Sequence, residues 1–148
     1  MTKPAPVQTL LDLSKLRLDE ATRMLGALIS GEQTSSERLK LLVGYRAEYH
    51  TRFMAAAQNG IDRNSWRNYQ AFLDRLDASI AQAEEAVNQS RQRTALGQRE
   101  WLGKKGRMRA FDTLVQRHQI REQYAAQQIE QKAQDEFAAQ RFASKEGE

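Results

Sequence analysis

Cysteine is absent from this sequence of 148 residues, and its only two prolines, Pro4 and Pro6, lie at the N-terminal end. Without cysteine the chain can form neither disulfides nor thiolate metal sites. Without proline beyond residue 6, the sequence contains none of the kinks or helix ends that an internal proline imposes. Long uninterrupted helices are therefore open to this chain.

Other features are just as scarce. The two histidines, His50 and His118, cannot hold a zinc ion by themselves, and no apolar run reaches the 18 residues that a membrane-spanning helix needs. The first ten residues, MTKPAPVQTL, lack the apolar core of a signal peptide. We therefore expect no metal, no membrane span and a cytoplasmic location.

The composition favours exposed helices over a globular core. Charged residues make up 28% of the chain and the mean hydropathy is −0.76. Such a chain can bury a narrow seam between helices, and its length leaves room for one domain. We expect a single coiled-coil domain over residues 1–148.

One glycine-containing turn divides the sequence into two helical stretches. Asn59-Gly60 tolerates a positive φ and ends the first helix. Asp62, Asn64 and Ser65 are all suitable N-caps for the second helix, and Ser65 is the preferred start. The prediction is an all-α, antiparallel two-helix coiled-coil hairpin with a helix at about 8–57, a turn at 58–64 and a longer helix at about 65–143.

Apolar residues recur at spacings of three and four on both helices, as in a heptad repeat. In the first helix, polar residues interrupt this repeat at Ser14, Glu32, Ser35 and Arg46; in the second helix it fades between Ser90 and Gly97. Folding back near residue 61 places Gln8 beside about residue 114. The last 25 to 30 residues of the second helix then have no partner in the chain, and such a helix is marginal in water.

The sequence offers little catalytic chemistry. Gly103-Lys104-Lys105 resembles a phosphate-binding loop, but Gln98 stands where that loop needs glycine and Lys105 where it needs serine or threonine. Adjacent carboxylates such as Glu84-Glu85 do not share a helix face. We therefore predict a protein that is not an enzyme, with no cofactor and no small-molecule substrate.

A basic stretch lies within the second helix and contains only two acidic residues, Glu100 and Asp112. Three interpretations stay open for it: a solvated helix face, a face for an acidic protein partner and, least favoured, a nucleic-acid surface that neutralises phosphates. Its basic members are Arg91, Arg93, Arg99, Lys104, Lys105, Arg107, Arg109, Arg117 and Arg121.

Aromatic residues gather on both sides of the turn. Tyr45 and Phe72 stand off the apolar repeat, so we expect both to be partly exposed. Exposed aromatic side chains on a thin pair of helices suggest a protein-binding patch, although a pure seam role is the alternative.

Taken together, these residues resemble the flagellar FliJ family along nearly the whole chain. The resemblance is carried by the early segment LLDLSKLRLDEATRMLG, by Asn59-Gly60-Ile61 and by the late Asp135-Glu136-Phe137. It is also carried by two groups that flank the turn, namely Leu39, Leu42, Tyr45, Glu48 and Tyr49 on one side and Trp66, Tyr69, Gln70 and Phe72 on the other.

The resemblance implies a component of the flagellar type III export apparatus, needed for flagellum assembly and motility. Its implied partners are the hexameric export ATPase, the membrane export gate protein and the export chaperones of minor filament proteins. It also implies a cytoplasmic location, peripherally associated with the inner membrane at the flagellar basal body. The implied gate-binding residues are Leu42, Tyr45, Tyr49, Phe72 and Leu76, whereas Arg38, Ser79 and Ala83 depart from the family's expected Gln, Ala and His.

The unpartnered end of the second helix is the expected contact with the ATPase ring. The residues predicted for that contact are Arg107, Arg109, Arg117, Arg121, Ala125 and Ile129. Two other functions stay open from the sequence: a general soluble export chaperone and a basic nucleic-acid-binding helical hairpin, the latter being unlikely.

Overall fold

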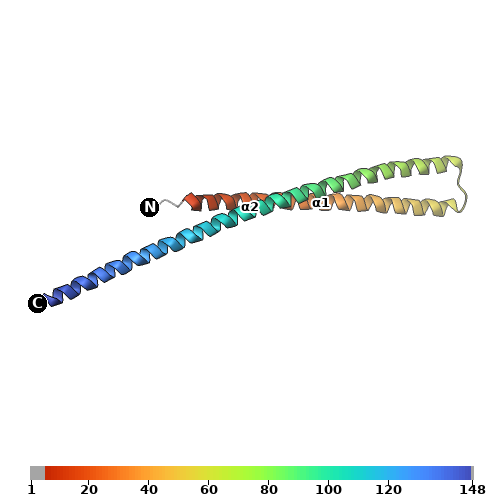
Figure 1. The fold of residues 1–148 in the computed structure, drawn as a ribbon. Helices are drawn as coiled ribbons and strands as arrows, with labels where there is room; N and C mark the ends of the chain where they lie inside the picture. The colour runs from red at the N-terminus through yellow and green to blue at the C-terminus, as the bar shows by residue number, and fades with distance from the viewer. Residues whose placement is uncertain (1–5, 148) are drawn as a thin grey trace. The chain divides into compact units, whose positions relative to one another are not determined.

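The computed structural model describes residues 6–147, and these form two helices (Figure 1). α1 runs over Pro6–Ala57 and α2 over Arg63–Glu146. No strand occurs within residues 6–147. The predicted all-α hairpin with a longer second helix is confirmed.

The turn between the helices is built by one glycine and one aspartate. Gly60 has a φ of 88°, a conformation that glycine adopts without a Cβ penalty, and its N–H donates to the Ala57 carbonyl at 3.0 Å. The Asp62 carboxylate then accepts a hydrogen bond from the Ser65 N–H at 3.0 Å, so Asp62 is the N-cap of α2. The preferred start at Ser65 is wrong, because α2 begins at Arg63.

The outer helix ends also lie slightly beyond the predicted positions. α1 begins at Pro6 instead of residue 8, because proline suits a first helical position whose N–H has no intrahelical acceptor. α2 continues to Glu146 instead of residue 143. The predicted end of the first helix at residue 57 agrees with Ala57.

The chain divides into two compact units, which we describe separately. Residues 19–103 form the turn unit, which contains the turn and the flanking parts of both helices. Residues 6–18 and 104–147 are the described part of the terminal unit. α2 is continuous through the boundary at Gly103.

In the turn unit the two helices pack along one narrow seam. Burial on α2 recurs at spacings of three and four from Tyr69 to Thr94, the pattern of an antiparallel coiled coil. Ser90 and Gly97, where the apolar repeat of the sequence fades, are half-buried and still belong to this seam. The buried side chains of the turn unit are Ala21, Tyr69, Leu73, Ala83, Val87 and Thr94.

Polar residues at seam positions meet partners across the helix pair. The Ser35 and Ser90 hydroxyls lie 3.3 Å apart, and Arg91 Nε lies 3.7 Å from Glu32 Oε1. The Thr94 hydroxyl lies 3.4 Å from the Leu28 carbonyl oxygen of α1 and 3.0 Å from the Ser90 carbonyl oxygen of its own helix, and it can donate to either. These polar layers interrupt the apolar sequence repeat, yet the helices stay paired through them.

In the terminal unit the seam ends partway along α2. Leu11, Ser14 and Val115 are buried, and Met108 and Phe111 are half-buried. Every described residue from 116 to 147 is exposed. The sequence prediction of an unpartnered end to the second helix is therefore confirmed within this unit.

Candidate functional site

A groove with three aromatic side chains among its six lining residues lies between α1 and α2 in the turn unit. It encloses about 420 Å³. Tyr45, Glu48, Tyr49 and Arg52 line it from α1, and Phe72 and Leu76 line it from α2. We call these six residues the aromatic groove.

A stack of rings forms the base of this groove. The Tyr49 and Phe72 ring centroids lie 4.3 Å apart, and Tyr49 stacks on Tyr69 at 5.7 Å. Tyr69 is buried and stacks in turn on Phe53 with centroids 3.6 Å apart. Because Tyr69 supports Tyr49, and Tyr49 in turn contacts Phe72, the groove presents a prearranged surface to a partner.

Polar contacts fix the helices beside these rings. Arg46 pairs with Asp77 across the seam, with Nε 2.5 Å from one carboxylate oxygen and Nη2 3.4 Å from the other. This hydrogen bond raises the pKa of Arg46 above its ordinary value. His50 Nδ1 also forms a hydrogen bond with the Tyr69 hydroxyl. These contacts set the register in which the groove forms.

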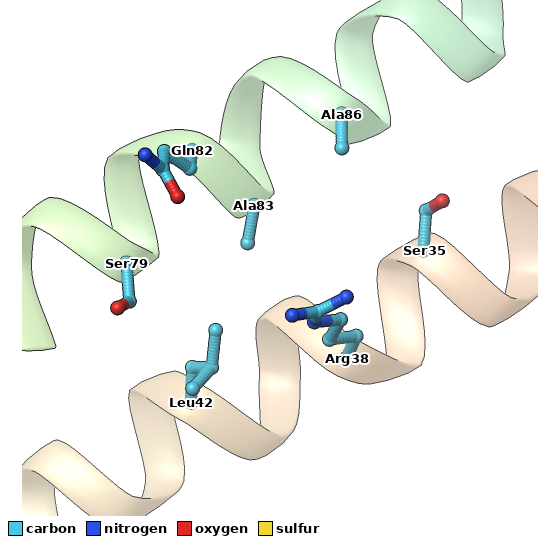
Figure 2. A pocket seen from close by; sticks show the side chains of 7 residues that line it. All are labelled: Ser35, Arg38, Leu42, Ser79, Gln82, Ala83 and Ala86. Atoms are coloured by element: carbon cyan, nitrogen blue, oxygen red, sulfur yellow. The ribbon is translucent and has the colours of Figure 1, made fainter.

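A second pocket of about 270 Å³ lies farther from the turn (Figure 2). We call it the Arg38 pocket; its lining residues are Ser35, Arg38 and Leu42 of α1 and Ser79, Gln82, Ala83 and Ala86 of α2. The Arg38 side chain reaches from α1 toward α2, and Ala83 points back from the opposite helix. Arg38 is the only charged residue in the lining.

The structure brings the residues predicted for gate binding close together. Tyr45, Tyr49, Phe72 and Leu76 line the aromatic groove, and Leu42 lines the Arg38 pocket. Tyr45 is 53% exposed and Phe72 is 39% exposed, which confirms the expected partial exposure of both.

The residues predicted for the ATPase ring are spread along one helix. They lie along α2 in the terminal unit, and all are exposed: Arg107, Arg109, Arg117, Arg121, Ala125 and Ile129. Within residues 116–147 the side-chain contacts are local, as where His118 Nε2 lies 3.1 Å from Glu122 Oε1. This stretch of α2, which we call the exposed segment, carries large apolar side chains at Ile120, Tyr124, Ile129, Phe137 and Phe142.

The described part of the chain shows neither a candidate metal site nor a candidate membrane span. Within residues 6–147, no three carboxylates or histidines come together as a metal site. No helix over the same residues is long and apolar enough to cross a membrane.

Sequence reasoning missed several residues of these sites. Glu48 and Arg52 line the aromatic groove, and helical spacing from Tyr45 and Tyr49 could have indicated them. Asp77 carried no such signal, because its importance depends on meeting Arg46 across the seam. Arg38 was noted as a departure from a family pattern, but not as the centre of a pocket.

Comparison with known proteins gives full-length matches. The family model described as "Flagellar FliJ protein" matches residues 2–147. The flagellar FliJ proteins of Salmonella typhi and of Escherichia coli strain K12 are 36% and 34% identical to this chain. Both alignments extend over 148 residues and cover 100% of each chain.

Proposed function

Because the chain belongs to the flagellar FliJ protein family, we propose that it is a non-enzymatic component of the flagellar type III export apparatus that couples the export ATPase ring to the membrane export gate. Family membership supports a place in the export apparatus. The division of labour within the chain is our proposal: the aromatic groove binds the gate, and the exposed segment enters the ring.

The observation that carries the proposal is the exposed segment. Its large apolar residues stand at 120, 124, 129, 137 and 142, all 63% exposed or more. At about 100° per residue these spacings spread over several sides of the helix and form no single stripe. A partner helix would cover one stripe only, whereas a ring surrounds its occupant. The central hole of a hexameric ATPase therefore suits this segment.

Charge adds to the fit between the segment and a ring. Arg107, Arg109, Arg117 and Arg121 are exposed on the same helix and lie before or at the start of the exposed segment. In the proposal they meet acidic side chains at the mouth of the ring. Exposed ion pairs are weak individually and weaken further with salt, so the arginines orient the helix and apolar contacts hold it.

The aromatic groove supplies the second binding site of the coupling function. Tyrosine and other large side chains set in a preformed pocket are typical anchors of protein interfaces. The groove belongs to the turn unit and the exposed segment to the terminal unit. Because different residues form the two sites, binding at one does not use the side chains of the other. In the proposal, gate binding also keeps the chain peripherally associated with the inner membrane at the basal body.

The export chaperones of minor filament proteins are further proposed partners. Exposed apolar side chains support this part of the proposal, since exposed apolar surface marks sites of protein interaction. Capture of such a chaperone by the purified full chain tests it. A chain truncated after Arg121 that captures the chaperone equally well would contradict a role for the exposed segment in that contact.

The main test measures ATP hydrolysis by the purified export ATPase with the full chain added. We expect truncation after Arg121 to abolish stimulation, while binding to the cytoplasmic domain of the gate protein stays intact. Within the full chain, Ile129→Asp should weaken ATPase binding by about tenfold, because it removes an apolar side chain that becomes buried when the ring encloses it.

A matched control separates apolar contact from added charge. Gln131→Asp introduces the same charge in the same exposed segment without removing an apolar group, so it should leave stimulation close to that of the natural chain. Equal loss in both variants would point to charge repulsion. Full stimulation by the truncated chain would contradict the assignment of the exposed segment to the ring.

A further inference from the structure

The Arg38 pocket contains a cation without a partner. Arg38 forms no ion pair with any residue in the range 6–147, and no carboxylate lines the pocket. The opposite wall carries no charge and is made by Ser79, Gln82, Ala83 and Ala86, three of which have small side chains. The space that remains beside the guanidinium, about 270 Å³, is large enough for a side chain from another molecule (Figure 2).

Two other arginines of the turn unit provide the contrast. Arg46 is held by Asp77, and Arg91 lies near Glu32, each pair joining α1 to α2. The acidic partner that completes those two cross-helix pairs is missing opposite Arg38. An arginine fork binds a carboxylate with two parallel hydrogen bonds, so Arg38 offers a free site of that chemistry.

The Arg38 pocket and the aromatic groove share one side of the helix pair. On α1 their lining residues recur at 38, 42, 45, 49 and 52, and on α2 at 72, 76, 79, 83 and 86. Spacings of three and four place such residues on one helix face. A single partner segment can therefore lie along both pockets. At 1.5 Å per residue, Arg38 lies about 10 to 16 Å along α1 from Tyr45 and Tyr49.

We propose that the Arg38 pocket binds an aspartate or glutamate side chain of the same export gate segment that places its apolar side chains in the aromatic groove. The inference rests on the proposed gate binding and names the partner's chemistry at this site. The partner carries the acidic side chain about 10 to 16 Å from its apolar anchors. Arg38 thus favours a gate segment that carries a negative charge at this point. The aromatic groove alone would not discriminate by charge.

Titration of the full chain with the purified cytoplasmic domain of the gate protein tests this inference. Arg38→Gln should weaken binding by about tenfold, because a hydrogen-bonded carboxylate loses its charged partner. Arg38→Glu should weaken binding further, and reversal of one acidic residue in the gate segment should restore it. The loss should shrink as salt rises from about 0.1 M to about 0.5 M.

Lys40→Glu serves as the matched control. It makes the same charge reversal two residues along α1, outside both pockets, and Lys40 is exposed. Its effect should stay within about twofold, the usual range for surface substitutions. Circular dichroism of all variants should show the natural melting behaviour, because Arg38 is exposed and contributes no cross-helix pair.

The alternative outcomes are distinguishable. If Arg38→Gln binds like the natural chain while Tyr45→Ala weakens binding, the carboxylate inference is wrong and the proposed gate binding stands. If the natural chain does not bind the gate domain, both are wrong. If Arg38→Glu instead changes the sedimentation of the chain alone, a second copy fills the pocket and the inference is overturned.

Discussion

At the scale of single residues, Gly97 shows how closely the helices of the turn unit approach. A Cβ built at this position would lie 2.6 Å from Leu28 Cδ1 and 3.6 Å from Leu25 Cδ1. Gly103 belongs to the same unit and has nothing within 4 Å of such a Cβ. Alanine at either position improves helix propensity, but only at Gly97 does its Cβ meet a close neighbour. Comparing the two substitutions therefore separates the effect of helix propensity from the effect of packing.

We predict opposite outcomes for alanine at these two glycines. Gly103→Ala should raise the free energy of unfolding by about 1 kcal/mol, the usual gain in helix propensity. Gly97→Ala should lose that gain and finish at least about 1 kcal/mol below Gly103→Ala, because Leu28 must move. Urea unfolding followed by circular dichroism measures both. Equal stabilisation in the two variants would show that Leu28 moves aside at no cost.

Asp62 gives the turn a dependence on pH. Hydrogen bonds from Ser65, through its side chain first and its backbone second, lower the pKa of the Asp62 carboxyl. A lowered pKa in the folded chain adds stability above the unfolded value of about 3.9, and that stability is lost as pH falls through the folded pKa.

The prediction compares Asp62→Asn with the natural chain across pH. Asparagine keeps the capping geometry and removes the charge, so the variant should melt at a lower temperature at neutral pH. The gap should close as the pH falls below about 4. Thermal melts from pH 7 to pH 2 measure it. A gap that persists unchanged at pH 2 would assign the effect to geometry and not to ionisation.

At the scale of the helix pair, the Arg46–Asp77 contact fixes register beside the aromatic groove. We predict that Arg46→Asp and Asp77→Arg each lower the melting temperature, because each places like charges at 46 and 77. The double exchange should recover most of the loss, since it restores the opposite pair. Both side chains are substantially exposed, so high salt should reduce the effects. Purely additive losses would rule out direct coupling.

The exposed segment should differ from the rest of α2 in dynamics. Residues 116–147 are exposed throughout, whereas α2 has buried seam residues from Tyr69 to Thr94 in the turn unit and at Val115 in the terminal unit. An isolated helix is marginal in water, so amide hydrogens in the exposed segment should exchange much faster than those before it. Hydrogen–deuterium exchange with mass spectrometry measures this, and added ATPase should slow exchange there. Uniform protection along α2 in the free chain would contradict the prediction.

Some features could be predicted from the sequence because they depend on local order. The helix lengths follow from the absence of proline and the single turn, and the exposure of Tyr45 and Phe72 follows from their offset from the repeat. The cross-helix partners could not be read in this way. In the sequence, residues such as Ser35 and Arg46 only interrupt the apolar repeat. Their contacts with Ser90 and Asp77 depend on the register that the turn sets between the helices. The Arg38 pocket forms because most of the side chains facing Arg38 from α2 are small. It could not be predicted from any single residue of the sequence.

At the scale of the whole molecule, the hairpin must form within one chain. The Ser35 and Ser90 hydroxyls are 3.3 Å apart, and the sequence has no cysteine to compete. We predict that Ser35→Cys combined with Ser90→Cys forms a disulfide within a single chain under oxidation. Mass spectrometry and non-reducing gels detect it. A covalent dimer as the main product would instead indicate pairing between chains.

The exposed segment also bears on how long a copy of the chain survives in a cell. Helices that open readily are the preferred targets of proteases, and this one presents basic side chains at Arg121, Lys132 and Arg141. A copy whose segment is enclosed by a partner hides those sites. We therefore expect unassembled copies to be degraded faster than assembled ones. The steady-state abundance of this protein would then depend on the number of its binding sites in the export apparatus and not on its rate of synthesis.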